Sequence, residues 1–340
     1  MPPTIKDVAV EAQVSVATVS RVVNGSASVR PTVRQRVEAA VGKLGYQPNA
    51  LASGLRRKST LTVGLVVNNI YNPFYAELTK GVEDVARLYG YSIILCNSGT
   101  NPEQERRYLE VLLSRRVDGI IISPTGGNRK AFERVVANGV PMVQVDRQVP
   151  GLQVDTVVVD NRQGVREAIL HLVALGHRRI GAIVGPSGIS TGRERLAGYL
   201  ESLQEAGLPV IDELVKEGDF LKQSGYRLFG ELMSLGQPPT AVFTANNEMA
   251  AGSLLAARER GLRLPDDLAF VTYDDPDWSV LVDPPLTVVR QPVYAVGTTA
   301  ANRLFDHLRQ PEVSGPVHVV LAPQLIIRRS SGVKQDHGSG

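Results

Sequence analysis

The sequence contains very little cysteine and no long apolar run. Its single cysteine, Cys96, excludes an internal disulfide and fits a reducing compartment. No stretch of about 18 consecutive apolar residues occurs, and this argues against a membrane-spanning helix. The first residues also lack a basic segment followed by an apolar one, which is the pattern of a secretory signal. We therefore expect a cytoplasmic protein that does not bind membranes.

Signatures of nucleotide-dependent and metal-dependent chemistry are also missing. The glycine-rich stretch at 185–192 lacks the G-x-G-x-x-G spacing, and no P-loop sequence occurs. The five histidines do not show metal-ligand spacing. Asp274 and Asp275 are adjacent, so at a strand end their carboxylates point to opposite faces and make a poor acid–base pair. We expect no enzyme activity, no catalytic residue, no metal and no cofactor.

Positive charge is concentrated in the first 60 residues. This segment contains nine lysines and arginines and three acidic residues, a net charge of +6, whereas the whole chain carries +3. The remaining 280 residues therefore carry −3. A basic head on a slightly acidic body is typical of a module that binds a polyanion and is joined to a second function. A charge imbalance that serves only solubility is the alternative.

The head contains three short helical patterns. Thr4 is placed to cap a first helix, and Ser15 is placed to cap a second helix that runs to about Asn24. A third helix follows Pro31 and ends before Gly45. Because a tight turn joins the first two helices, the pattern predicts a helix-turn-helix.

The outward face of the second helix is unusual for a surface that meets only water. In the major groove, Val16 and Ala17 would suit a thymine methyl group, and Arg21 would suit the O6 and N7 atoms of guanine. A helical hairpin that packs on protein is the alternative. Ser15, Ser20 and Asn24 could donate to phosphates, and we also expect Thr4 and Thr18 among the DNA-binding residues.

The segment 49–60 follows the head and leads into the body. Asn49 can cap a short helix in which Ala52 and Leu55 share one side, and Gly54 weakens such a helix by roughly 1 kcal/mol relative to alanine. A helix this short is marginal alone because nucleation is costly, so we expect it to order only against a partner. A plain basic linker is the alternative.

From Leu61 onward, apolar strands alternate with helical patterns. Near-continuous apolar strands predict parallel sheets that are covered on both faces. The scheme occurs twice, which predicts two α/β lobes with a cleft between the strand ends of both sheets. The ten expected strands are 61–67, 91–96, 118–123, 142–146, 156–160, 179–185, 214–220, 240–245, 268–274 and 286–292.

Four stretches carry a resemblance to a known family. They are "TIKDVAVEAQVSVATVSRVVNG", "VEAAVGKLGYQPNALASGL", "NPFY" and "NNEMAAG". They resemble the lactose-repressor (LacI/GalR) family of bacterial transcription regulators, over residues 4 to about 330. The resemblance implies an all-α helix-turn-helix head and an α/β bilobed body of the type I periplasmic-binding-protein fold. It also implies a homodimer that binds a pseudo-palindromic operator in double-stranded DNA.

The resemblance assigns DNA contacts to both parts of the head. Positions matching Val16, Ala17 and Arg21 read the major groove in the family. The segment matching 49–55 is a hinge helix that folds on DNA, and its residues matching Ala52 and Leu55 enter the minor groove. Two Leu55 side chains, one from each subunit, would then open a central base step.

We expect the following domain organisation. The head spans 1–48, the hinge helix and linker 49–60, the effector-binding and dimerisation body 61–330, and a disordered tail 331–340. The N-lobe comprises about 61–160 plus 291–321, and the C-lobe about 161–290 plus 322–330. The tail lacks the leucine repeat of tetrameric family members, and this favours a dimer.

Loops at the strand ends carry the expected ligand contacts. Aromatic side chains can cover the apolar face of a sugar ring, while aspartates accept from hydroxyls and arginines donate to them. Two arginines opposed by two aspartates leave the site near neutral, which favours a neutral sugar, ribose-like or another monosaccharide. The resemblance points to Tyr71, Asn72, Phe74, Tyr75, Asp146, Arg147, Arg195, Phe220, Asn246, Asp274 and Gln291.

Several of these assignments have alternatives. Asp146 and Arg147 could form a surface ion pair, and Phe74 with Tyr75 could be ordinary core. Trp278 could cover the ligand or line an interface, and Tyr71 could lie at the lip of the cleft. At position 247 an aspartate is common in the family, and this chain has an asparagine. This chain therefore lacks the carboxylate that the family commonly places at 247.

These observations together predict a ligand-responsive transcriptional repressor. It would lie in the cytoplasm and associate with the nucleoid when bound to DNA. A sugar-binding or sugar-processing protein whose head does not bind DNA is one alternative. A regulator that responds to a purine or a sugar acid is another.

Overall fold

The computed structural model describes residues 3–23, 29–46, 59–310 and 315–332. The chain divides into two compact units, Met1–Thr60 and Leu61–Gly340, and each is described by itself. Within the described ranges, no helix is long and apolar enough to cross a membrane.

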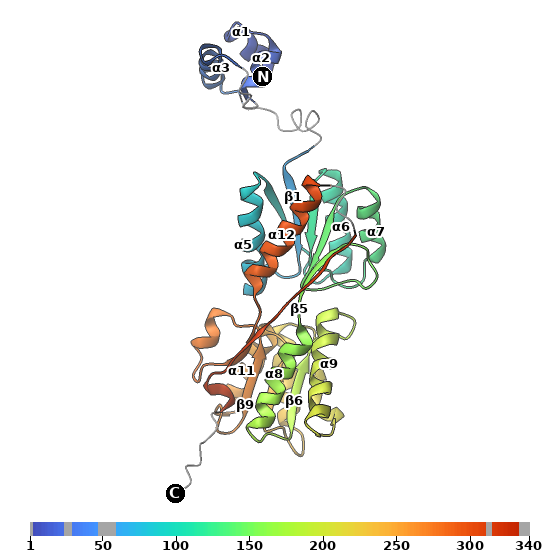
Figure 1. Ribbon diagram of the computed structural model, residues 1–340. Coiled ribbons are helices and arrows are strands. Elements are labelled where there is room, and N and C mark those ends of the chain that lie inside the picture. The colour runs from blue at the N-terminus through green and yellow to red at the C-terminus, as the bar shows by residue number, and fades with distance from the viewer. Residues whose placement is uncertain (1–2, 24–28, 47–58, 311–314, 333–340) are drawn as a thin grey trace. The chain divides into compact units, whose positions relative to one another are not determined.

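The first unit contains three short helices, α1 (Ile5–Glu11), α2 (Val16–Val23) and α3 (Pro31–Leu44) (Figure 1). These helices confirm the predicted helix-turn-helix, with all three packed on one another. Apolar residues at helical spacing form a small common core: Val8, Ala9, Ala12, Val19, Val22, Val37 and Ala40.

Local hydrogen bonds set the ends of these helices, as the sequence predicts. Thr4 and Asp7 form a capping box at the start of α1. At the start of α2, the Thr18 backbone N–H donates to Ser15 Oγ over 3.1 Å. Gly45 ends α3 with a φ of 61°, a left-handed conformation that glycine adopts without steric cost.

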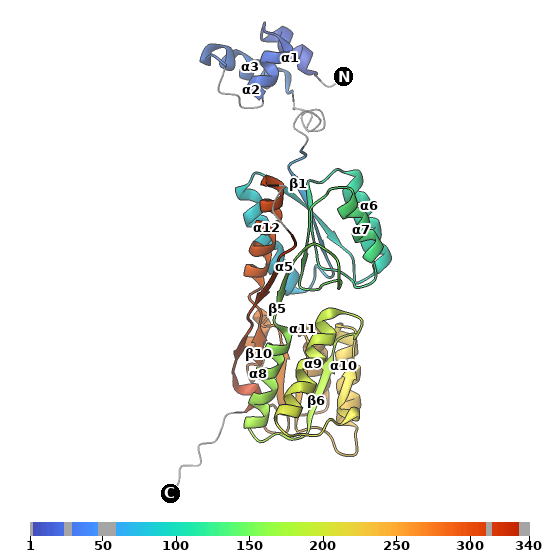
Figure 2. The ribbon, with the colours of Figure 1, turned by 45° about the vertical axis from the view of Figure 1, so that its right-hand side comes forward.

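The N-lobe of the body is a six-stranded sheet covered on both faces. Its strands are β1 (Thr62–Val67), β2 (Ser92–Asn97), β3 (Gly119–Ile122), β4 (Met142–Val145), β5 (Asp155–Val159) and β11 (His318–Leu321). Their order across the sheet is β11-β5-β4-β3-β1-β2. Helices α5 (Pro73–Leu88) and α12 (Val293–Arg309) cover one face, and α6 (Pro102–Ser114) and α7 (Arg129–Ala137) cover the other (Figure 2).

The C-lobe repeats this plan with a second six-stranded sheet. Its strands are β6 (Ile180–Val184), β7 (Val215–Glu217), β8 (Ala241–Thr244), β9 (Ala269–Tyr273), β10 (Thr287–Arg290) and β12 (Gln324–Ile326). Their order is β12-β10-β9-β8-β6-β7. Helix α8 (Asn161–Ala174) packs on α9 (Ser190–Glu205), and α10 (Lys222–Met233) packs on α11 (Asn247–Glu259).

Two short strands depart from the sequence expectation. Each of the ten expected strands is present, but β11 and β12 were not expected. Among the described strands, β10 and β12 form an antiparallel pair, whereas the other pairs run parallel. The chain leaves β11 in the N-lobe and enters β12 at once in the C-lobe, so β12 reaches its sheet without a crossover helix.

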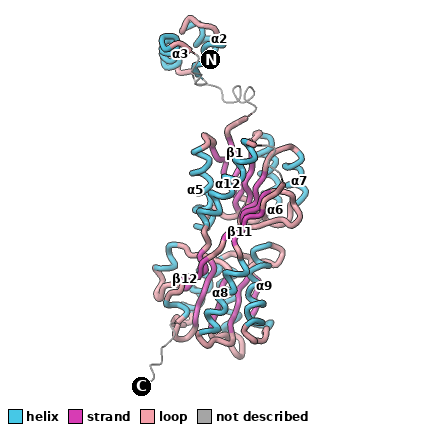
Figure 3. The backbone as a smooth tube through the Cα atoms, viewed as in Figure 1, coloured by secondary structure: helices cyan, strands magenta, loops and turns pink. Residues whose placement is uncertain are grey.

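Three crossings join the lobes. They lie between β5 and α8, between β10 and α12, and between β11 and β12, and Figure 3 shows the two groups of strands that they connect. The parallel strands of both sheets end toward the region between the lobes, where the loops that follow them line a common cavity. The fold therefore brings polar loops from two sheets together.

The C-terminal end of the body extends past the expected start of the tail at residue 331. Ser331 is buried in a short 3₁₀-helix, Arg329–Ser331. Its hydroxyl lies 2.9 Å from His171 Nε2 and 2.8 Å from Thr287 Oγ1. These contacts fix residue 331 to the C-lobe, which corrects that boundary; residues 333–340 lie outside the described part of the chain.

Candidate effector cleft and DNA-reading helix

The outward face of α2 presents the side chains expected to read base pairs. Val16 is 41% exposed, and Ala17 and Arg21 are exposed as well. Val19 and Val22, on the opposite face, are buried in the core of the head. The surface of α2 therefore combines small apolar groups with one guanidinium, which suits base edges in a major groove.

Three of the polar side chains expected on DNA already stabilise helix ends. Thr4 Oγ1 donates to Asp7 Oδ2 over 2.7 Å, and hydrogen bonds from Thr4 hold the pKa of Asp7 below its usual value. Ser15 Oγ and Thr18 Oγ1 lie 2.9 Å apart. Their contact with DNA stays a prediction, as does that of Ser20. The other expected DNA contacts, Asn24, Asn49, Ala52 and Leu55, lie outside the described residues.

Ten of the eleven residues expected to bind a ligand line one cavity between the lobes. They come from both lobes and lie in the loops and helix starts that follow strand ends. These residues are Asn72, Phe74, Tyr75, Asp146, Arg147, Arg195, Phe220, Asn246, Asp274 and Gln291. Phe74 and Tyr75 also belong to the N-lobe core, and their contact with a ligand stays a prediction.

The backbone of the cavity is strained at four positions. Thr100, Asp146, Phe220 and Asp274 have φ values of 58°, 62°, 67° and 75°, in the left-handed region that non-glycine residues rarely adopt. Such strain persists only where the surrounding structure imposes it, and it concentrates at functional sites. The loops of this cavity are therefore built to place particular side chains.

A hydrogen-bond network positions the carboxylate of Asp146. Its Oδ2 atom accepts from Tyr75 Oη over 3.0 Å and from Ser123 Oγ over 3.1 Å. Burial raises the pKa of Tyr75 to about 12, so its phenol stays protonated and donates. Asn68, which is fully buried, donates to both hydroxyls from behind. The network fixes an acceptor at the N-lobe wall.

Arg147 is a buried arginine whose donors are not all used. It is 6% exposed, and its Nε atom lies 3.6 Å from Asp146 Oδ2, which is too long for a hydrogen bond. Its guanidinium carbon lies 5.4 Å from the ring centroid of Phe220, across the cleft. Among the described residues, Nε and Nη1 have no hydrogen-bond partner. The ion pair with Asp146 is therefore buried and not on the surface, and the protein leaves donors of Arg147 unused; its contact with a ligand stays a prediction.

Arg195 differs because the protein itself satisfies its donors. Its Nε donates to Asn161 Oδ1 over 2.8 Å, and its Nη1 donates to the Ala245 carbonyl over 2.5 Å. The guanidinium lies 3.7 Å from the ring centroid of Tyr273. These contacts hold the positive charge at the C-lobe wall of the cavity.

The two adjacent aspartates of the C-lobe point in different directions, as predicted. Asp274 faces the cavity, where it accepts from Gln291 Nε2 over 2.6 Å and from the Asn247 backbone over 3.2 Å. Burial raises the pKa of Asp274. Asp275 instead accepts from Arg290 and Arg328. The pair therefore does not form an acid–base site.

Two residues for which the sequence left two interpretations open do not line this cavity. Tyr71 is 86% exposed and does not line the cavity, because it stands at the outer corner of a turn in which Asn72 N–H donates to the Asn69 carbonyl. Trp278 lines a separate groove on the C-lobe. Five further residues line the cavity: Asn68, Asn69, Thr100, Thr191 and Leu221. Asn68 directly follows β1, so the strand-end rule could have found it.

The cavity is small for its number of polar groups. Its volume is about 50 Å³. That is room for roughly three or four waters, whereas ligand pockets usually measure about 300–1,000 Å³. A sugar ring therefore needs the two walls to separate or their side chains to move.

The fold and the site together define a class of protein. A helix-turn-helix head joined to a bilobed body with a polar interlobe cavity is the construction of a DNA-binding regulator controlled by an effector. The chain belongs to the LacI family: residues 4–49 match the bacterial regulatory proteins of the lacI family, and residues 60–320 match the periplasmic binding proteins and sugar-binding domain of that family.

Individual relatives agree with this assignment over almost the whole chain. Catabolite control protein A of Priestia megaterium is 38% identical, covering 96% of this chain and 99% of its own. The transcriptional repressor CytR of Escherichia coli K12 is 34% identical over 96% of each chain. CytR is a transcriptional repressor, and the family is one of regulatory proteins and not of enzymes.

Solved structures show the same architecture. The lac repressor dimer bound to operator and the anti-inducer ONPF is 31% identical with a TM-score of 0.86, covering 98% of this chain and 100% of its own. The complex of the regulator CelR with cellobiose is 36% identical with a TM-score of 0.74, covering 96% and 99%.

Proposed function

We propose that this protein is a repressor whose operator affinity is controlled by a small neutral sugar, bound between the lobes by the ten predicted residues that line the cavity. The observation that carries the proposal is Arg147, which lines the cavity and whose buried Nε and Nη1 have no hydrogen-bond partner among the described residues. Such donors are costly unless a ligand oxygen pairs with them.

The charge balance of the cavity supports a neutral ligand. Arg147 and Arg195 bring two positive charges, and Asp146 and Asp274 bring two negative ones. A phosphate or sugar acid would add a negative charge beside two fixed carboxylates. A neutral sugar instead offers hydroxyls that both accept from arginine and donate to aspartate. The cellobiose complex of CelR is a precedent in a relative.

The bilobed fold supplies a route from sugar to DNA. A ligand that changes the separation of the lobes shifts the N-lobe relative to the C-lobe, and the head is attached to the first strand of the N-lobe. In a dimer, each α2 would take one half-site of a pseudo-palindrome. Such a protein acts in the cytoplasm, on the nucleoid when it is bound to its operator.

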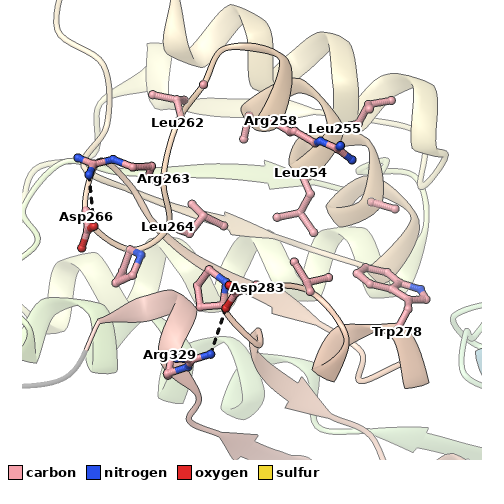
Figure 4. A pocket seen from close by; sticks show the side chains of 16 residues that line it. Leu254, Leu255, Arg258, Leu262, Arg263, Leu264, Asp266, Trp278, Asp283 and Arg329 are labelled. Carbon is pink, nitrogen blue, oxygen red and sulfur yellow. Dashed lines mark hydrogen bonds and ion pairs between the residues drawn. The ribbon is translucent and has the colours of Figure 1, made fainter.

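The C-lobe offers a surface for the second copy of the chain. A groove of about 920 Å³ lies on α11 and the loops beside it, and Figure 4 shows Leu254, Leu255 and Trp278 among its side chains. Leu281, close to it in the chain, is 81% exposed. Exposed apolar patches of this kind mark protein–protein contacts. We expect the wild type to sediment as a dimer and Leu255→Glu to sediment as a monomer. Equal sedimentation of both proteins would contradict the assignment of this groove to the dimer interface.

The function is tested by measuring operator affinity with and without sugar. An operator selected from random DNA would be titrated by fluorescence anisotropy, alone and with each sugar that binds. Coupling between such sites is typically ~1–3 kcal/mol and must be reciprocal, so operator has to change sugar affinity by the same factor. The same operator affinity with and without bound sugar would refute the allosteric part. If a purine or an acid bound instead of a sugar, the ligand assignment would be wrong, but the assignment as a regulator would stand.

A further inference from the structure

Two asparagines join the lobes across the cleft. Asn72 caps α5 in the N-lobe, and Asn247 is the first residue of α11 in the C-lobe. Asn72 Nδ2 donates to Asn247 Oδ1 over 3.1 Å, and Asn247 Nδ2 donates to Asn72 Oδ1 over 2.9 Å. The two side chains are only 8% and 1% exposed. This reciprocal pair, the amide latch, is neutral and shielded from water.

Both residues of the latch also form hydrogen bonds with residues that line the cavity. Asn72 Oδ1 also accepts from the Phe74 backbone over 3.0 Å, and the Asn247 backbone donates to Asp274 Oδ2. Asn72, Phe74 and Asp274 all line the cavity, whereas Asn247 does not. A hydroxyl that takes over the side-chain amide of Asn72 must therefore displace Asn247.

The same geometry limits the space for a ligand. With the latch formed, the cavity holds about 50 Å³, while a hexose has about twelve non-hydrogen atoms and needs several times that room. Asn247 lines a neighbouring cavity of about 340 Å³ that shares Phe74, Asp274 and Gln291 with the first. The latch therefore stands where separation of the lobes would open the cleft.

We propose that the Asn72–Asn247 pair is a ligand-displaceable latch that holds the two lobes closed, and that effector entry requires its opening. The inference rests on the proposed function only in taking the cleft as the effector site. An asparagine at 247 gives each amide one donor and one acceptor. An aspartate there would lack the donor and would add a negative charge beside Asp274. This side chain thus sets how readily the cleft opens.

The test measures the separation of the lobes in the full-length protein. Spin labels at Lys130→Cys on α7 and Gln204→Cys on α9 report one N-lobe and one C-lobe position, both exposed, in a Cys96→Ala background. Labelled chains are mixed with excess unlabelled chains so that each measured distance lies within one chain. Asn247→Asp keeps the shape of the side chain but removes one hydrogen bond and adds charge. Asn247→Ala removes both bonds without adding charge.

Both variants are expected to lengthen and broaden the interlobe distance, with the closed fraction relative to the open one falling about tenfold or more. The matched control is Asn101→Asp, the same chemical change at a helix cap whose partners Glu103 and Gln104 lie in its own lobe. This control should keep the wild-type distance. Unchanged distances in both Asn247 variants would overturn the latch. Since no effector is used, a failed sugar hypothesis leaves this result intact.

Discussion

Replacing Arg147 by methionine should weaken effector binding strongly while changing the free energy of unfolding only a little. Methionine keeps much of the length of the side chain and removes the guanidinium. The structure shows two opposing terms in the folded state. The change removes an attraction to Asp146 across 3.6 Å, worth about 5 kcal/mol at an effective dielectric constant near 20. It also removes two buried donors without described partners, each of which costs about 1–3 kcal/mol.

These terms nearly cancel, so we expect the free energy of unfolding to change by less than about 2 kcal/mol. Arg195→Met is the matched control. Arg195 loses two hydrogen bonds that are made within the protein and its contact with the Tyr273 ring. Each hydrogen bond from a charged donor contributes about 1.5–3 kcal/mol, so losing both should lower the free energy of unfolding by about 3–6 kcal/mol.

In contrast to stability, effector affinity should fall strongly in Arg147→Met. Two hydrogen bonds from a charged donor to sugar oxygens contribute about 1.5–3 kcal/mol each, so Kd should rise by at least about a hundredfold. The assays are urea denaturation followed by circular dichroism and calorimetric titration of the effector. If Arg147→Met unfolds as easily as Arg195→Met and still binds the effector normally, Arg147 is structural and the reasoning fails.

Three further changes have defined outcomes. Arg21→Ala should weaken the preferred operator by roughly 1–3 kcal/mol and relax the choice of one base pair; uniform weakening over all DNA sequences in competition assays would mean that Arg21 contacts only phosphate. Gly185→Ala should reduce effector affinity, because a Cβ there would lie 1.9 Å from the Phe220 ring and displace it; calorimetry showing wild-type affinity would mean that this ring does not contact the effector. Burial alone would raise the pKa of Asp275, but hydrogen bonds from Arg328, Ser279 and Arg290 outweigh it and lower the pKa to about 2. About 2 kcal/mol of stability is therefore present above pH 4 and is lost as the pH falls from about 4 to 2. In Asp275→Asn, the urea denaturation midpoint should depend less on pH over that range. The same pH dependence in the variant and the wild type would contradict this role of Asp275.

Local patterns predicted most of the fold. The caps at Thr4 and Ser15, the glycine after α3 and the ten apolar strands are each specified by neighbouring residues, and each is present. Strands β11 and β12 were not predicted because they are short and partly exposed, so their composition does not mark them as buried strands. Their place depends on the third crossing between the lobes, which is a property of the whole topology.

The candidate site was predictable where residues follow strand ends. Asp146 and Asp274 were expected there, and the structure places both at one cavity. For Tyr71 the sequence left ligand contact and the lip of the cleft open, because only the direction of the turn decides whether its side chain points inward. The latch between Asn72 and Asn247 joins residues 175 positions apart. Nothing local to either asparagine reveals that pairing, since it depends on how the lobes close.

The central claim is that the polar cavity between the lobes binds a neutral sugar through Arg147. The most direct test is calorimetric titration of the full-length protein and Arg147→Met with neutral pentoses and hexoses, cellobiose, sugar acids, sugar phosphates and purines. We predict that a neutral sugar binds the wild type and that its binding is lost in Arg147→Met. A purine, phosphate or sugar acid that binds most tightly, or a sugar whose affinity is the same in both proteins, would contradict the claim.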